Sequence, residues 1–379
     1  MPRLRISMVL LVGLLSGCAS SLTGQPESAV SGPLHTGSHS LDRASLDTLA
    51  ADIRRGEFGN THALLIFRKN ELAYEAYFSG DDRQWGSQEW KRSVQFGPAR
   101  LHDARSVTKT IVSTLVGIAI RDGHIPSRDT PLYDLLPSYR HLLTERKREL
   151  TLRHLLTMTP GLQWNELGAG PNDEVRMYES ADPIAFVLQR PLVAEPGTTW
   201  EYNGGTSQLL GVILEARTAR PIEDYARQVL FEPLGITSFE WRGDVAGMPS
   251  ASSGLRLLPG DFAKLGLMFQ AKGRWGGKQV VPAEWLVEAT QMQIEIPRAP
   301  EAPTWTLWSG YGFQWWYDEF SGAHGPFRVS TASGLGGQRI FVVPQYDLVV
   351  VVLSGHYGKP GTSWTPEHIL QRVTQSLRI

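Results

Sequence analysis

The chain lacks the residues that several classes of protein need. It has 379 residues and one cysteine, so no disulfide can form within it. It has no H-E-x-x-H sequence and no cysteine pair, and therefore suggests neither a metal site nor a bound cofactor. Basic and acidic residues balance, 37 against 38, and no basic block is present, which argues against a nucleic-acid partner. A G-x-S-x-G motif is also absent.

The N-terminus has the pattern of an export signal. Two arginines among the first five residues precede an apolar run over residues 6–15, which is too short to span a membrane. Residues 15–18 resemble a bacterial lipobox, with the single cysteine at the position that would be lipidated. We therefore expect a signal peptide over 1–17 and a flexible tether over 18–40. A lipid on Cys18 would hold the protein to a membrane of the cell envelope, facing the periplasm or the exterior. The alternative is an ordinary signal peptide with a chance cysteine.

Strands are predicted at both ends of the chain and helices in the middle. Residues 62–78 predict two strands around a turn near Lys69 and Asn70. Apolar residues cover most of the surface of a helix predicted over 106–120, so this helix should be buried. Helix signals also occur in the segments 45–56, 152–158, from 182, 205–217, 221–231, 261–271, 282–291 and 365–377. Strands rich in Val and Ile are predicted over 327–331, 338–343 and 348–353.

This order of elements predicts an α/β (α+β) fold. One antiparallel sheet would be built from both ends of the chain, with an all-helical lobe inserted between its halves. The folded domain would span 41–379. Its sheet lobe would comprise 41–115 and 300–379, and its helical lobe 116–299.

Ser106 and Lys109 are the first candidates for catalysis. Two residues three positions apart on a helix lie on the same face, so their side chains can touch. A serine needs a base to act as a nucleophile, and a lysine serves only when neutral. Burial in the apolar helix is expected to lower the pKa of Lys109, and Ser106 at the helix start could offer its own backbone N–H to an oxyanion. On these residues alone, a helix-capping serine followed by a lysine that reaches solvent is an equal alternative.

Several spaced segments resemble one known family in the right order. They are 102–120, 152–162, 196–205 with 209–211, 253–256 and 334–338. These segments resemble the serine β-lactamase and penicillin-binding-protein superfamily, most closely the branch of class C β-lactamases and related esterases and peptidases. The resemblance covers about residues 45–379. It implies a β-lactamase/transpeptidase-like fold: a five-stranded antiparallel sheet with flanking helices, an all-helical lobe, and a site between the two lobes.

The resemblance also implies roles for residues. Ser106 would be the nucleophile, Lys109 its base or proton partner, and Tyr202 the group that passes a proton to the leaving group. A core tyrosine is the alternative for Tyr202. The second motif of the family is usually Tyr-x-Asn, whereas here Asn203 stands one place early and Gly204 takes the third position. Asn203 is therefore the candidate for the amide contact to the substrate.

The third motif of the family usually begins with Lys or His, followed by Thr-Gly or Gly-Gly. Here Leu335 precedes Gly336 and Gly337, so no cation stands at that position to bind a substrate carboxylate. The two glycines would let a substrate lie against the strand, and the backbone N–H of Gln338 would be the second oxyanion donor. Arg339 could replace the missing cation, or could be an exposed strand residue.

These observations predict a serine hydrolase that attacks an ester, amide or β-lactam carbonyl of a small-molecule or peptide substrate through an acyl-enzyme. One alternative is a penicillin-binding or ligand-sensing envelope lipoprotein of the same fold with little or no turnover. Another is a structural envelope lipoprotein that uses the lobes as a binding surface. A Ser-His-Asp triad also stays open, with His102 and His154 nearest to the matched segments. The aromatic residues of 305–317 are interpreted as packing or as an apolar acyl pocket.

Overall fold

The computed structural model describes residues 40–243, 247–296, 302–358 and 364–378. The predicted signal peptide, Cys18 and all but the last residue of the predicted tether lie outside these residues. Within the described part of the chain, no helix is both long enough and apolar enough to cross a membrane.

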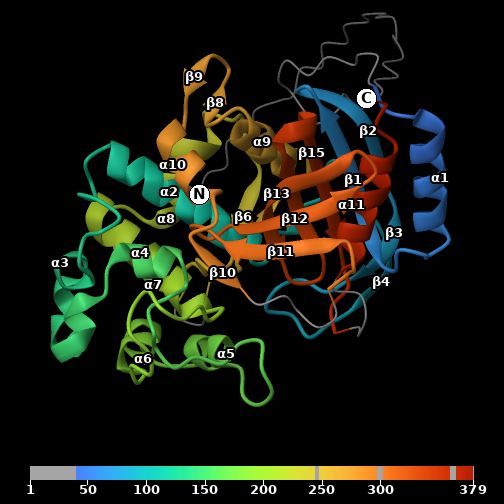
Figure 1. Ribbon diagram of the computed structural model, residues 1–379. Coiled ribbons are helices and arrows are strands. Elements are labelled where there is room, and N and C mark those ends of the chain that lie inside the picture. The colour runs from blue at the N-terminus through green and yellow to red at the C-terminus, as the bar shows by residue number, and fades with distance from the viewer. Residues whose placement is uncertain (1–39, 244–246, 297–301, 359–363, 379) are drawn as a thin grey trace, which may run out of the picture.

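Strands predominate near both ends of the described chain and helices in its middle (Figure 1). The helices are α1 (Arg43–Arg54), α2 (Val107–Arg121), α3 (Leu132–Leu135), α4 (Leu152–Leu156), α5 (Asp173–Tyr178), α6 (Pro183–Gln189), α7 (Gly204–Thr218), α8 (Ile222–Ala226), α9 (Pro259–Gln270), α10 (Ala283–Ala289) and α11 (Thr365–Gln375). The strands are β1 (Thr61–Arg68), β2 (Glu71–Tyr77), β3 (Ser79–Asp82), β4 (Lys91–Gln95), β5 (His102–Asp103), β6 (Phe239–Trp241), β7 (Leu255–Leu257), β8 (Arg274–Trp275), β9 (Lys278–Gln279), β10 (Ile294–Ile296), β11 (Thr306–Tyr311), β12 (Trp316–Gly322), β13 (Gly325–Gly334), β14 (Gln338–Val343) and β15 (Leu348–Ser354).

Eight antiparallel strands form the main sheet, in the order β10-β11-β12-β13-β14-β15-β1-β2. The contiguous set β13-β14-β15-β1-β2 is built from both ends of the chain, and it corresponds to the five strands that the resemblance implied. Strands β10, β11 and β12 extend this set to eight. The segment that forms β11 and β12 is rich in Trp and Tyr, which favour strands, but lacks the Val and Ile runs that reveal the other late strands.

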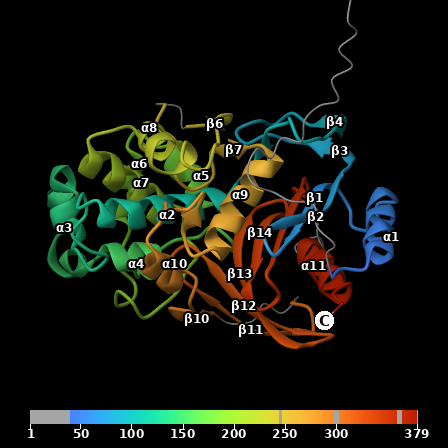
Figure 2. The ribbon, with the colours of Figure 1, turned by 90° about the horizontal axis from the view of Figure 1, so that it is seen from above.

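The central strands contribute to two separate cores. Val349 and Val351 of β15 belong to the core shared with α2 and α9, whereas Val350 and Val352 belong to the core shared with α1 and α11. This alternation is expected of a strand that is buried on both faces, and it explains the nearly continuous apolar sequence of β15. Figures 1 and 2 both show α1 and α11 on the side of the sheet away from the helical lobe.

Helices α3 to α8 gather into a lobe beside the sheet (Figure 2). The helical lobe is predicted to span 116–299, but two elements of this segment belong with the main sheet. Helix α9 packs on β14 and β15, and β10 is an edge strand of the sheet. Helix α2 contacts α7 on one side and β13 on the other. All of its residues except the last two are buried, which confirms the burial predicted for this helix. The start of α2 therefore lies where the two lobes meet.

Candidate active site

The first turn of α2 is held in place by a short strand pair. Ser106 caps α2, and β5 ends three residues before it. Strand β5 pairs with β7, and the Ala104 amide donates a hydrogen bond to the Leu255 carbonyl over 2.8 Å. This pairing brings the serine-rich turn that precedes β7, which includes Ser252, beside the first turn of α2.

The amine of Lys109 has three polar neighbours. Its Nζ donates a hydrogen bond to the Ser106 Oγ over 3.1 Å and another to the Ser252 carbonyl over 3.0 Å. It lies 3.7 Å from Oε1 of Glu174. Only 1% of Lys109 is exposed, so the lysine does not reach solvent. The contact between the serine and the lysine is the one that their spacing predicts.

Acidic neighbours hold the proton on Lys109. Burial by itself lowers the pKa of this amine, but Tyr202, Glu174 and Glu166 outweigh burial and raise the pKa above its ordinary value. The prediction of a lowered pKa is therefore wrong, because the lysine is buried together with acidic groups. Its side chain is an ammonium that donates to Ser106.

Two glutamates that the sequence did not single out lie beside this ammonium. Oε1 of Glu174 accepts a hydrogen bond from the Ser252 hydroxyl over 2.5 Å. Oε2 of Glu166 accepts one from the Trp164 indole over 2.9 Å and one from the Gly204 amide over 2.6 Å. No local motif reveals either residue, because their position depends on how α5, which carries Glu174, and the segment before it, which carries Glu166, pack beside Lys109.

Glu166 titrates near neutral pH. Burial raises the pKa of this carboxyl, and the nearby Glu174 raises it further. Lys109 and the two hydrogen bonds lower it, and the balance leaves the pKa of Glu166 at about 7. The site therefore gains negative charge as the pH rises through this value.

Tyr202 reaches the site from the segment just before α7. The Lys109 Nζ lies 5.1 Å from the centre of its ring, and the ring of Trp316 stacks on it with centroids 5.9 Å apart. Burial raises the pKa of Tyr202, and Lys109 and a hydrogen bond with Ser106 offset this rise only in part. Tyr202 therefore lies next to both members of the serine–lysine pair.

Ser106, Tyr202 and the two glutamates line a cavity of about 600 Å³. This volume lies in the range typical of small-molecule sites. Leu167 contributes from the helical lobe, and Trp316 and the hairpin 333–337 contribute from the sheet. The cavity therefore lies between the lobes, where the resemblance placed the site.

The hairpin between β13 and β14 carries the predicted third motif. Leu335, Gly336 and Gly337 line the cavity, and both glycines have a positive φ, +84° and +91°. Gln338 is not part of this lining. It is fully buried, and its side chain donates to the Ser354 carbonyl over 2.6 Å and accepts from the Ser354 amide over 3.1 Å. The end of β13, at Gly334, is therefore part of the cavity lining, whereas Gln338 at the start of β14 is not.

Gly334, the last residue of β13, passes very close to the chain that leads into α2. A Cβ added to Gly334 would lie 2.4 Å from the Ala104 carbonyl oxygen and 3.1 Å from the Arg105 Cβ. A side chain would therefore push β13 away from Ser106. Glycine at this position keeps the strand backbone beside the segment that leads into Ser106.

Asn203 caps a helix and does not face the cavity. It is fully buried, and its Oδ1 accepts a hydrogen bond from the Thr206 amide over 3.1 Å at the start of α7. The structure thus differs from the prediction of a substrate contact. The physical reason is that the first amides of α7 have no partner within the helix and need an acceptor from the preceding residue.

Arg339 lines the cavity as half of a buried ion pair. Its Nε lies 2.7 Å from Oε1 of Glu367 in α11, and one guanidinium nitrogen donates to the Gly334 carbonyl over 3.2 Å. Only 12% of the Arg339 side chain is exposed. Neither predicted alternative describes it, because Arg339 is not an exposed strand residue and Glu367 balances its charge.

The two histidines that left a Ser-His-Asp triad open have other partners. His102 Nε2 lies 2.8 Å from His62 Nδ1, and His154 Nδ1 accepts a hydrogen bond from the Thr151 amide over 3.1 Å. Neither ring is part of the cavity lining. His356 does line the cavity, but the side chain whose amine donates to the Ser106 Oγ is Lys109, which favours the serine–lysine arrangement.

A family model described as Beta-lactamase matches residues 60–366. The chain belongs to the beta-lactamase family. The chain is 25% identical over 327 residues to the 6-aminohexanoate-dimer hydrolase of Paenarthrobacter ureafaciens. The aligned region covers 82% of this chain and 77% of that protein.

Solved structures show the same fold. EstCE1, a hydrolase with promiscuous acyltransferase activity, matches with a TM-score of 0.69 at 16% identity, over 89% of this chain and 99% of that one. The octameric penicillin-binding protein homologue from Pyrococcus abyssi matches with a TM-score of 0.64 at 18% identity, over 87% and 77% of the two chains. The protein thus has the β-lactamase/transpeptidase fold that its sequence predicts, and the family to which it belongs is one of serine hydrolases.

Replacing Glu166 by Gln should change how stability depends on pH. The folded protein holds the Glu166 proton more tightly than the unfolded chain, because folding raises the pKa from 4.5 to about 7. The wild type therefore loses stability as the pH rises through this window, by on the order of 3 kcal/mol, and Glu166→Gln does not. Urea unfolding at a series of pH values from 4.5 to 8 measures the difference.

Glu179→Gln is the matched control, since Glu179 is an exposed glutamate just after α5. Its pH dependence should follow the wild type. Parallel curves for the wild type and Glu166→Gln would contradict a Glu166 pKa near neutrality.

Proposed function

We propose that this protein hydrolyses esters or amides through an acyl-enzyme on Ser106. The observation that carries the proposal is the 3.1 Å contact between the Ser106 Oγ and the Lys109 Nζ beside a cavity of about 600 Å³. A hydroxyl next to a buried amine and a phenol has the partners that an activated nucleophile requires.

The acidic neighbours provide a route for the proton. As an ammonium, Lys109 cannot accept the Ser106 proton, so it first passes a proton to the Glu174 carboxylate, 3.7 Å away. The Ser106 oxygen then bonds to the substrate carbonyl carbon, its proton moves to the Lys109 amine, and the carbonyl electron pair moves onto the oxygen.

Tyr202 completes the transfer to the leaving group. Collapse of the tetrahedral intermediate breaks the bond to the leaving group, which takes the Tyr202 proton while Lys109 returns a proton to the phenol. Attack by water on the acyl-enzyme then reverses these transfers, releases the acid and restores Ser106.

The developing oxyanion would lie between the start of α2 and the end of β13. The Ser106 amide is at the N-terminal end of α2, where the helix dipole favours negative charge. We assign the second donor to the backbone at Gly334 in place of Gln338, because Gly334 lines the cavity and borders Ala104.

Two exposed leucines support a substrate with an apolar group. Leu167 and Leu335 are 67% and 64% exposed, yet both line the cavity, one from the helical lobe and one from the hairpin. Apolar side chains at the mouth of a cavity favour apolar ligand groups. Since Leu335 replaces the usual cation and Glu367 balances Arg339, an uncharged ester or amide suits the cavity better than a carboxylate-bearing β-lactam.

Ser106→Ala should abolish both turnover of p-nitrophenyl acetate and covalent labelling by a fluorophosphonate, read as intact mass. Ser113→Ala removes another hydroxyl from the same helix, outside the cavity lining, and should leave both unchanged. Full activity of Ser106→Ala would contradict the proposal. A Ser106-dependent adduct with penicillin but no turnover of esters would favour the low-turnover, penicillin-binding alternative.

The leucines should determine the preference for acyl chain length. For p-nitrophenyl esters from acetate to octanoate, we expect kcat/KM to rise with chain length in the wild type. Leu167→Ser or Leu335→Ser should lower the octanoate value by about tenfold, because each leucine loses apolar contact with the chain, and should leave the acetate value unchanged. Leu307→Ser changes an exposed leucine outside the cavity lining and should match the wild type. A profile without any dependence on chain length would contradict this substrate class.

We further propose that the protein is an envelope lipoprotein anchored through Cys18. The lipobox-like residues 15–18 support this, since the one cysteine of the chain stands where lipid attachment requires it. A Cys18→Ser variant expressed in a bacterial host should lose incorporation of a palmitate analogue and leave the membrane fraction. Equal labelling of the variant would contradict the anchor.

A further inference from the structure

The residue before the nucleophile has a strained backbone. Arg105 has a φ of +50°, in the left-handed region that residues other than glycine seldom adopt. Such a conformation persists only where surrounding contacts impose it, and it is concentrated at functional sites. The contacts that impose it here set the direction in which Ser106 leaves the chain.

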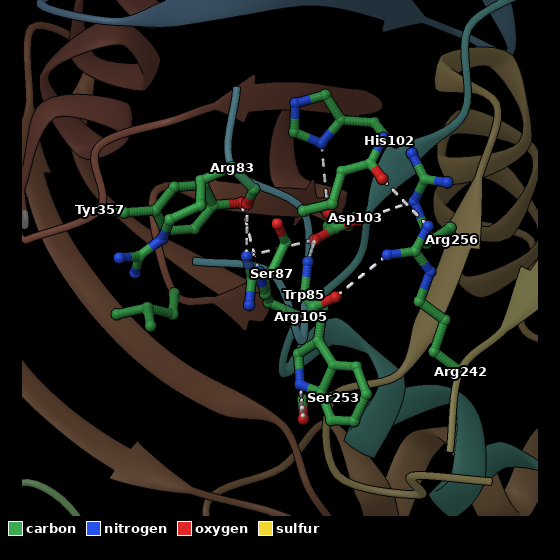
Figure 3. A network of polar contacts seen from close by, with 12 residues as sticks. Arg83, Trp85, Ser87, His102, Asp103, Arg105, Arg242, Ser253, Arg256 and Tyr357 are labelled. Carbon is green, nitrogen blue, oxygen red and sulfur yellow. Dashed lines mark hydrogen bonds and ion pairs between the residues drawn. The ribbon is translucent and has the colours of Figure 1, made fainter. Parts of the chain in front are cut away.

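Two nitrogens of the Arg105 guanidinium donate hydrogen bonds to different partners. One guanidinium nitrogen donates to the Arg83 carbonyl over 2.7 Å, and Nε donates to the Tyr357 hydroxyl over 3.3 Å (Figure 3). The guanidinium carbon also lies 4.5 Å from the centre of the Tyr357 ring. The same tyrosine packs against Gly336, where an added Cβ would come within 2.3 Å of its ring. Arg105 is thereby linked to the hairpin that lines the cavity.

Asp103 is the centre of the network drawn in Figure 3. Its carboxylate is buried, with Oδ1 2.7 Å from Nε of Arg256 and Oδ2 3.2 Å from the guanidinium of Arg105. The Trp85 amide donates to the same Oδ2. Both carboxylate oxygens are thus engaged, and two arginines balance the buried charge.

A second part of the network leads to the turn that binds Lys109, the hydrogen-bond partner of Ser106. The Trp85 indole donates to the Ser253 hydroxyl over 2.8 Å. Ser253 follows Ser252, whose carbonyl accepts the 3.0 Å hydrogen bond from Lys109. The Asp103 carboxylate therefore contacts Arg105, the residue before Ser106. Through Trp85 it also supports the turn whose carbonyl accepts from Lys109.

We infer that Asp103 and Arg105 are positioning residues for the reaction: their ion pair holds the Ser106 hydroxyl and the Lys109 amine in contact. Neither side chain is part of the cavity lining, so both act through the groups they hold. This inference rests on the proposed function of Ser106. Without the ion pair, the left-handed turn relaxes and the serine oxygen moves away from its proton partner.

The test compares the rate of fluorophosphonate labelling, kcat and KM for p-nitrophenyl acetate, and urea unfolding. Asp103→Asn and Arg105→Gly should lower the labelling rate and kcat by about tenfold to hundredfold and leave KM within about twofold. Glycine adopts positive and negative φ about equally, so Arg105→Gly removes the strain and keeps the fold if Asp103→Asn does not, while it leaves the turn free to relax. Arg105→Lys keeps the charge and should recover part of the rate.

Asp261→Asn is the matched control. Asp261 forms an equally buried ion pair with Lys264 in α9, 2.8 Å long and away from the cavity lining. It should lose stability without slower labelling. Labelling of folded Arg105→Gly at the wild-type rate would overturn the inference, as would equal slowing by Asp261→Asn. A wild type that takes no label at Ser106 would instead refute the proposed function, and this inference with it.

Discussion

The site depends on one buried charge, the ammonium of Lys109. An ammonium removed from water is very unfavourable unless acceptors and opposite charge replace its hydration. Here the Ser252 carbonyl, the Ser106 hydroxyl and the Glu174 carboxylate do so, and they come from three different parts of the chain. Helix α5 and the turn before β7 must therefore pack against the start of α2 for the lysine to be buried among these partners.

The charge of Lys109 also orders the chemistry. Because acidic neighbours raise its pKa, the lysine rests as a proton donor to Ser106, and it must lose a proton before it can serve as a base. In the mechanism we propose, Glu174 is the group that takes up that proton. The site is thus better described as a serine and a lysine with two carboxylates and a phenol than as an isolated Ser-x-x-Lys motif.

Elements with a regular apolar pattern could be predicted from the sequence, and those set by packing could not. Helix α2 and strands β1, β14 and β15 follow from runs of Val, Ile and Leu, and β2 follows from the turn near Lys69 and Asn70 that pairs it with β1. Strands β11 and β12 do not, because their aromatic residues suit loops, pockets and strands alike. The prediction for Asn203 is wrong for a similar reason. An asparagine before two glycines can contact a substrate or cap a helix, and only the position of α7 decides between the two.

By itself, the sequence determined that Ser106 and Lys109 can touch, since helix geometry places residues three apart on one face, and packing then decided that the lysine turns inward and not to solvent. It also determined the burial of α2, through apolar residues on all sides. The tertiary structure alone decided the acidic surroundings of Lys109, the presence of Glu166 and Glu174 at the site, and the absence of Gln338 from the cavity lining. Each of these depends on groups distant in the chain, whose fields and hydrogen bonds act over a few ångströms and are set only when the lobes pack together.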